Sequence, residues 1–177
     1  MSMKLFATIN FYILWLIAVM LAPDSLLWLL FLFLLTALQI FLCLKQFNFK
    51  LKISLFFLLG LISWCVDTLI SVFQLIDFKG DHFIFFAPYW LLFLWLAFIA
   101  VFIQCFHRHL QHVQLWVIAG ALALPFNYYL GCKLGAGVFL QPLYAMICYI
   151  LWGGGLFLLI CLLNSMISRY DNSSQKT

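Results

Sequence analysis

Long apolar stretches alternate with short polar gaps along the whole chain. Stretches of about 20 residues recur within its 177 residues, and a helix of that length crosses about 30 Å of hydrocarbon. Residues 28–35 are apolar on every face, whereas a strand of a membrane barrel alternates apolar and polar side chains. A helix also satisfies its own backbone hydrogen bonds, which hydrocarbon requires. The pattern therefore predicts an all-α, polytopic transmembrane helical bundle.

The polar gaps divide the chain into six predicted spans. These spans cover about residues 5–22, 26–44, 53–77, 88–106, 113–131 and 138–165. Residues 1–168 then form a single transmembrane domain, and residues 169–177 form a polar cytoplasmic tail that is too short to fold alone. Only 8% of the residues are charged, against about 25% in a water-soluble domain. The composition therefore excludes a soluble globular protein, and the net charge gives no reason to expect a nucleic-acid partner.

The distribution of lysine and arginine predicts the orientation of the bundle. With six spans, seven of the nine basic residues lie on the side of the two termini, and only Lys79 and Lys133 lie on the other. Basic residues are concentrated on the cytoplasmic side of membrane proteins. We therefore expect both termini in the cytoplasm, and we call the opposite half of the bundle the outer half.

One carboxylic acid lies at membrane depth. Asp67 is near the middle of the third span, where an ionisable group costs roughly 2.5–3.5 kcal/mol on insertion scales and usually faces the bundle interior. Small and polar residues flank it on both sides at steps of three or four, which places one polar stripe on one helix face. The stripe consists of Gly60, Ser63, Asp67, Ser71 and Gln74, with Trp64 beside it. Helix packing explains the glycine and serines equally well, whereas Asp67 is a candidate catalytic acid or base.

Further polar and aromatic residues gather in the outer parts of the last three spans. The fifth contains Asn127 and Tyr128 just after a proline, and the sixth begins with Gln141 and Tyr144 after a glycine-rich turn. The fourth span contributes Trp90 and Trp95, for which packing is the alternative. Together with Trp64, Ser71 and Gln74, these residues predict a polar pocket in the outer half with Asp67 at its floor. Asn10 and Gln39 lie nearer the cytoplasm, where we expect them to serve helix packing.

Motifs for metal or cofactor binding are absent from the sequence. The six cysteines are scattered singly, and the histidines at positions 107–112 form a basic loop suited to lipid headgroups. A zinc site needs three or four ligands in fixed geometry, and no such set is visible. We expect no metal and no cofactor. The chain has no glutamate, so acid–base chemistry inside the membrane would depend on Asp67.

Two sequence blocks carry a family resemblance. They centre on the segments 87–98 and 125–136, and the most specific positions are Pro88, Trp90, Trp95, Phe98, Pro125, Tyr128, Gly131 and Gly135. The chain resembles the small bacterial inner-membrane proteins grouped as domain of unknown function 2878. The resemblance implies a bacterial inner membrane and no established activity. Relatives are often encoded near lipid-modifying enzymes, which implies a lipid-related role.

Three functions are compatible with these residues. The first is a lipid-related accessory or binding protein, with membrane lipids as ligands or a membrane protein as partner. The second is a membrane-embedded, lipid-modifying enzyme that uses Asp67 as acid or base. The third is a small transporter of a lipid or metabolite.

Overall fold

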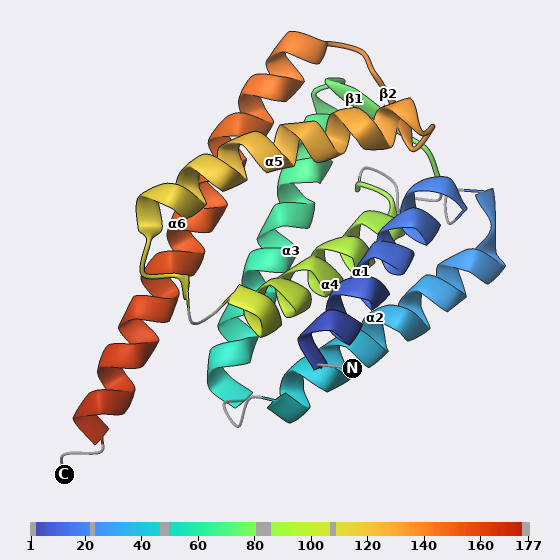
Figure 1. Ribbon diagram of the computed structural model, residues 1–177. Helices are drawn as coiled ribbons and strands as arrows, with labels where there is room; N and C mark the ends of the chain where they lie inside the picture. Colours follow the sequence, from blue (N-terminus) through green and yellow to red (C-terminus); the bar gives the residue numbers. More distant parts are fainter. Residues whose placement is uncertain (1–2, 22–23, 47–49, 81–85, 107–108, 175–177) are drawn as a thin grey trace.

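The computed structural model is a bundle of six helices (Figure 1), and it describes residues 3–21, 24–46, 50–80, 86–106 and 109–174. The helices are α1 (Met3–Met20), α2 (Leu26–Gln46), α3 (Lys50–Val72), α4 (Tyr89–Phe106), α5 (Val113–Lys133) and α6 (Pro142–Ser174). Two short strands, β1 (Ile76–Phe78) and β2 (Gly137–Phe139), accompany them. The predicted all-α class is confirmed, and the strands are an unpredicted addition.

Four of the described helices are long and apolar enough to cross a membrane. The spanning stretches are Leu26–Lys45, Tyr89–Phe106, Val113–Lys133 and Pro142–Met166. The apolar parts of α1 and α3 are shorter, at Lys4–Met20 and Phe57–Val72. Large apolar side chains cover the outside of the bundle, and Leu27 and Leu151 are 72% and 70% exposed. Apolar exposure on this scale marks a surface that faces lipid. The chain is therefore a membrane protein, and its sixfold crossing stays a prediction.

The structure shifts three of the predicted boundaries. The third helix ends at Val72 rather than residue 77, because Gln74 adopts a left-handed φ of 54° and turns the chain into β1. The sixth helix begins at Pro142 rather than residue 138, because residues 137–139 pair as a strand. Proline suits the first turn of a helix, where its missing N–H is not needed. The same helix continues to Ser174, well into the segment predicted as a polar tail.

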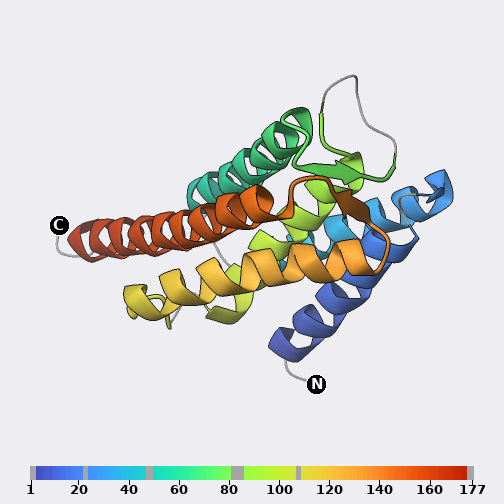
Figure 2. The same cartoon turned by 90° about the horizontal axis from the view of Figure 1, so that it is seen from above.

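The helices form two packing units, which Figures 1 and 2 show from two directions. In the four-helix unit, α1, α2 and α3 all pack against α4. In the hairpin unit, α5 and α6 run side by side along most of the length of α5. A Cβ atom added at Gly120 or Gly153 would overlap the backbone or side chains of the facing helix. These two glycines therefore set the close approach of α5 and α6.

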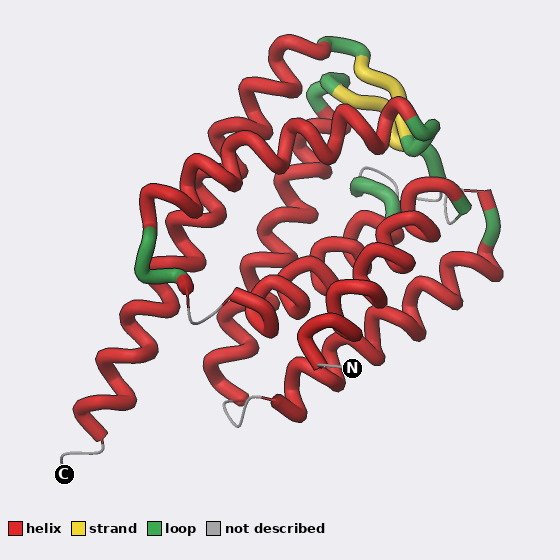
Figure 3. Tube along the Cα trace, in the orientation of Figure 1, coloured by secondary structure: helices red, strands yellow, loops and turns green. Residues whose placement is uncertain are grey.

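A two-stranded antiparallel sheet joins the two units at one end of the bundle. β1 follows α3 and β2 precedes α6, with Ile76, Asp77 and Phe78 opposite Phe139, Val138 and Gly137. Figure 3 shows the strands in yellow at this end, which we call the sheet end. A Cβ at Gly137 would lie 2.7 Å from the carbonyl oxygen of Asp77, and Gly135 has a φ of 96°. The glycine-rich turn therefore allows both the strand pairing and the reversal before it.

A chain of three carboxamides lies inside the four-helix unit. Asn10 Nδ2 donates to Gln39 Oε1 at 2.7 Å, and Gln39 Nε2 donates to Gln104 Oε1 at 2.8 Å. All three side chains are buried, and they come from α1, α2 and α4. A hydrogen-bonded polar chain of this kind fixes the register of helices in lipid. Asn10 and Gln39 therefore have the packing role that their positions predicted.

Candidate functional site

Asp67 is the acceptor at the centre of a hydrogen-bonded cluster. Its side chain is 0% exposed. Trp95 Nε1 donates to Oδ2 at 2.7 Å, and the Tyr149 hydroxyl donates to Oδ1 at 3.0 Å. The Tyr128 hydroxyl lies 2.6 Å from both carboxyl oxygens. We call these four residues the Asp67 cluster, and each comes from a different helix, α3 to α6.

The Asp67 cluster joins the four-helix unit to the hairpin unit. Asp67 and Trp95 belong to the first unit, whereas Tyr128 and Tyr149 belong to the second. The two tyrosine rings stack with centroids 3.7 Å apart and planes within 15° of parallel. A buried carboxyl group is costly unless donors compensate it, and three donors do so here. The stacked tyrosines can therefore reach the carboxyl group only while the hairpin unit stays docked.

The polar stripe predicted on α3 is buried over its first half only. Gly60, Ser63 and Asp67 are buried, whereas Ser71 is half-buried and Gln74 is exposed. A Cβ at Gly60 would lie 3.2 Å from Leu96 Cδ2, so α3 and α4 approach closely there. Because α3 ends at Val72, Gln74 lies in the turn that follows and no longer shares the helix face.

Trp64 has a structural partner outside the Asp67 cluster. Its Nε1 donates to the carbonyl oxygens of Ala87 at 3.1 Å and Pro88 at 3.3 Å. Its ring stacks on Phe86 with centroids 5.2 Å apart. The Ala87 N–H in turn donates to Thr68 Oγ1 at 3.0 Å. Trp64 therefore holds the segment that leads into α4.

The pocket residues predicted at the start of the sixth span lie on the exterior of the sheet end. Gln141 is exposed, and its Nε2 lies 3.5 Å from the carbonyl oxygen of Gln74. Tyr144 is 61% exposed. The structure therefore does not bring Gln141, Gln74 or Tyr144 together with Asp67.

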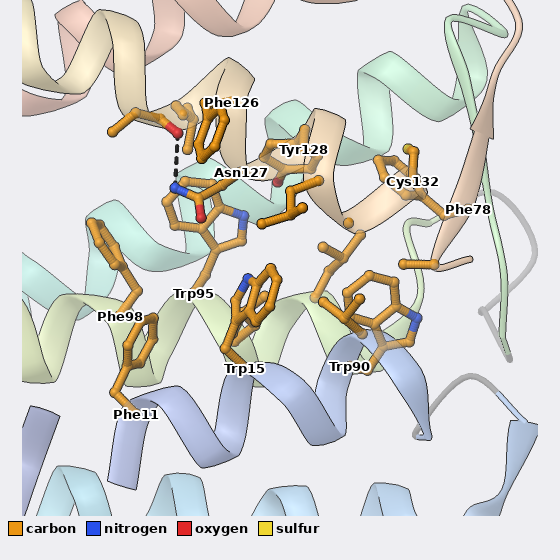
Figure 4. A pocket seen from close by; sticks show the side chains of 18 of the residues that line it. Phe11, Trp15, Phe78, Trp90, Trp95, Phe98, Phe126, Asn127, Tyr128 and Cys132 are labelled. Carbon is orange, nitrogen blue, oxygen red and sulfur yellow. Dashed lines mark hydrogen bonds between the residues drawn. The ribbon is translucent and has the colours of Figure 1, made fainter. Parts of the chain in front are cut away.

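A cleft opens between α1 and α5, with α4 at its base. The two helices pack against other elements rather than against each other, and the space between them is a cavity of about 400 Å³. Figure 4 shows aromatic side chains entering it from both walls. Its lining comprises Phe11, Tyr12, Trp15, Val19, Phe78, Trp90, Leu91, Leu94, Trp95, Phe98, Ala123, Leu124, Phe126, Asn127, Tyr128, Leu130, Gly131, Cys132, Ala136 and Phe157. We call this space the α1–α5 cleft.

The α1–α5 cleft differs from the polar pocket that the sequence predicted. Four predicted residues do line it, namely Trp90, Trp95, Asn127 and Tyr128. Its lining is mostly apolar, however, and Asp67 is not part of it. The carboxyl group instead lies behind Trp95 and Tyr128, to which it is hydrogen-bonded. Asp67 therefore fixes two of the side chains that shape the cleft.

Sequence reasoning missed Tyr149 and the α1 wall of the cleft. Tyr149 is fully buried in the apolar first part of α6. A phenol hydroxyl at that depth needs a hydrogen-bond acceptor, so the sequence could have indicated Tyr149 as a partner of a polar group. Phe11 and Trp15 have no such signal, because aromatic residues in an apolar span are equally suited to packing.

Metal-binding chemistry finds no support in the described residues. Among them, no group of three or more His, Cys, Asp or Glu side chains could hold a metal ion. The cysteines are free thiols, with Cys43 and Cys161 buried and Cys65 exposed. Within the described part of the chain, the Asp67 cluster and the α1–α5 cleft are the candidate functional features.

Comparison with known protein families gives one match, to the family described as "Protein of unknown function (DUF2878)", over residues 4–158. The chain belongs to this family. The resemblance carried by the two sequence blocks is thereby confirmed. The matched region of this DUF2878 protein contains the whole Asp67 cluster and every residue that lines the α1–α5 cleft. No curated protein and no solved structure matches the chain.

Proposed function

We propose that this DUF2878 protein is a membrane-embedded binding protein that holds the apolar chain of a lipid in the α1–α5 cleft. One observation carries the proposal: a mostly apolar cavity of about 400 Å³ lies between α1 and α5, two helices of a lipid-exposed bundle that do not pack against each other. Ligand sites usually enclose about 300–1,000 Å³ and are lined mainly by apolar and aromatic side chains. Because lipid surrounds the bundle, acyl or isoprenoid chains are the ligands present at high concentration.

The proposed topology has six spans and cytoplasmic termini in a bacterial inner membrane. It is supported by the seven basic residues on the side of the termini, against Lys79 and Lys133 at the opposite side. Lys79 directly follows β1 and Lys133 ends α5, so both lysines belong to the sheet end. The sheet end is then the outer end, and the cleft lies in the outer half of the membrane.

In this proposal, Asp67 is a positioning residue. A catalytic acid or base must reach the reacting atom within hydrogen-bond distance. A ligand in the cleft meets Trp95 and Tyr128 first, and both carboxyl oxygens already accept hydrogen bonds from them. Asp67 therefore acts by fixing the cleft wall. This geometry favours binding over the alternative of a lipid-modifying enzyme.

Two matched glycine substitutions test the proposed binding. Gly131 is buried and lines the cleft, yet a Cβ there would meet no atom of the described residues within 4 Å. Gly155 in α6 has equally open space but lies outside the cleft. Gly131→Leu therefore adds a side chain at the cleft lining where its Cβ meets no neighbour, and Gly155→Leu is its control.

The measurement is the amount of lipid that stays bound through purification in detergent, extracted and quantified by mass spectrometry. We expect wild type and Gly155→Leu to retain one tightly bound lipid species. Gly131→Leu should retain about tenfold less, the equivalent of roughly 1.4 kcal/mol. Equal retention by Gly131→Leu and Gly155→Leu would refute the proposed function.

A further inference from the structure

Most polar atoms along the α1–α5 cleft already have partners. Trp95 and Tyr128 donate to Asp67, and Trp90 Nε1 donates to the carbonyl oxygen of Lys79 at 2.8 Å. Apart from the hydroxyl of Tyr12, whose side chain is 63% exposed, two nitrogen or oxygen atoms of lining side chains differ. Trp15 Nε1 and Asn127 Oδ1 have no hydrogen-bond partner among the described residues. One is a donor and the other is an acceptor.

The orientation of the Asn127 carboxamide follows from its neighbour in the helix. Asn127 Nδ2 donates to the carbonyl oxygen of Ala123 at 2.8 Å. A carbonyl oxygen can only accept, so the amide nitrogen must face it and the amide oxygen must face away. Figure 4 shows this oxygen on the cleft side of α5, and it shows the indole nitrogen of Trp15 directed from α1 towards α5.

The two residues lie at similar distances from the sheet ends of their helices. Trp15 lies five residues before the end of α1, and Asn127 lies six residues before the end of α5. At 1.5 Å per residue, both positions are roughly 8–9 Å below the sheet ends of their helices. A donor on one wall and an acceptor on the other therefore line the same part of the cleft, where most of the lining is apolar.

We propose that the lipid held in the cleft carries a hydroxyl group at this level. This inference rests on the proposed function and names the ligand class. A hydroxyl oxygen accepts from Trp15 Nε1 while its proton is donated to Asn127 Oδ1. A carboxylate has no proton to donate, and no Lys or Arg of the described chain lines the cleft to balance its charge. A plain hydrocarbon would bury both polar atoms without partners, which is unfavourable. The ligand is therefore a lipid alcohol.

Competition binding with four chains of equal length tests the hydroxyl group. Protein in nanodiscs binds tritiated hexadecanol in a scintillation proximity assay, and unlabelled hexadecanol, hexadecyl methyl ether, palmitate and hexadecane compete. We expect hexadecanol to compete about tenfold better than the ether, because the ether cannot donate. The ether should in turn compete better than hexadecane, since it still accepts from Trp15. A monoacylglycerol in the same assay distinguishes a glycerol hydroxyl from that of a free lipid alcohol, and each would support the proposal.

Two variants locate the effect at the two side chains. In Asn127→Leu, hexadecanol should lose its advantage over the methyl ether. In Trp15→Phe, the ether should lose its advantage over hexadecane. Tyr144→Phe is the control, because its side chain is 61% exposed on the exterior of the sheet end, outside the cleft, and loss of its hydroxyl should leave the ranking unchanged.

The result that overturns the inference differs from the result that overturns the proposed function. If alcohol, ether and hydrocarbon compete equally while Gly131→Leu weakens all three, the cleft binds chains but does not select a hydroxyl group. Stronger competition by palmitate than by hexadecanol would equally overturn the inference. If none of the four chains competes, and Gly131→Leu and Gly155→Leu bind alike, the proposed function itself fails.

Discussion

The bundle contains two buried polar clusters that are built in opposite ways. In the carboxamide chain, Asn10, Gln39 and Gln104 pass hydrogen bonds from one helix to the next, entirely within the four-helix unit. In the Asp67 cluster, a single acceptor receives hydrogen bonds from three donors, and two of these belong to the hairpin unit. Gln104 Nε2 ends the carboxamide chain without a partner among the described residues.

The difference shows how each cluster can contribute to function. A carboxamide both donates and accepts, so each link of the chain depends only on its neighbours. The Asp67 cluster has one shared acceptor, so every donor depends on the same residue. Two of those donors, Trp95 and Tyr128, also line the α1–α5 cleft. Substitutions in the Asp67 cluster should therefore lower both lipid retention and the free energy of unfolding. Substitutions in the carboxamide chain should lower the free energy of unfolding alone.

Loss of the shared acceptor should have the largest effect. Asp67→Ala leaves three donors without an acceptor in a buried site, and each such donor costs about 1–3 kcal/mol. We expect the free energy of unfolding, measured by denaturant titration in micelles, to fall by about 4 kcal/mol. Lipid retention should fall as well, because Trp95 and Tyr128 lose their common anchor. Asp77→Ala is the control, since Asp77 is exposed on β1. An unchanged free energy of unfolding in Asp67→Ala would show that the Asp67 cluster does not stabilise the fold.

A break in the carboxamide chain should lower the free energy of unfolding by less and leave lipid retention unchanged. Gln39→Leu leaves Asn10 Nδ2 and Gln104 Oε1 unpaired inside the four-helix unit. We expect the free energy of unfolding to fall by about 2 kcal/mol, with lipid retention unchanged. Retention is scored per folded protein after size-exclusion chromatography. If Gln39→Leu releases lipid as readily as Asp67→Ala does, the two clusters do not differ as described.

Removal of one donor from the Asp67 cluster should have a smaller effect. Tyr149→Phe deletes the 3.0 Å hydrogen bond to Asp67 but keeps the ring that stacks on Tyr128. The carboxyl group still accepts from Trp95 and Tyr128. We expect a loss of about 1 kcal/mol in the same titration. Tyr128→Phe removes the 2.6 Å contacts and should cost more, and the reverse order would contradict the geometry.

A substitution that preserves the shape of the Asp67 side chain should have the smallest effect on lipid retention. Asp67→Asn keeps the size of the side chain and one carbonyl acceptor, so Trp95 and Tyr128 stay in place. We expect lipid retention close to that of wild type, with a modest loss of stability. An enzyme that used the carboxyl group for proton transfer would lose its activity. A lipidome of cells carrying Asp67→Asn, compared with deletion and wild-type cells, distinguishes these outcomes.

The sequence allowed the helical bundle to be predicted, because apolar length alone determines a membrane helix. It also identified Asp67, because one carboxylic acid stands out in an apolar span. The strands β1 and β2 could not be predicted, since each has three residues and forms only when its partner is present. The predicted site was partly misplaced for a related reason. Gln74 and Gln141 lie where helix ends were expected to continue, and a left-handed residue or a strand redirects them.

The sequence also could not predict which residues form hydrogen bonds with Asp67. Tyr128 and Tyr149 are separated from Asp67 by 61 and 82 positions, and only the docking of two units brings them to one carboxyl group. The α1 wall of the cleft depends on the same docking. Polar residues in an apolar span can therefore be found from sequence, but the residues that meet them depend on tertiary packing.

The most direct test of a lipid chain in the α1–α5 cleft is photo-crosslinking. Cells are fed a fatty alcohol that carries a diazirine near the end of its chain, and the labelled peptides of the purified protein are mapped by mass spectrometry. We expect labels on both cleft walls, near Phe11 in α1 and near Phe126 or Leu124 in α5, and their loss in Gly131→Leu but not in Gly155→Leu. Labels confined to exposed outer positions such as Leu151 in α6, unaffected by Gly131→Leu, would contradict the account.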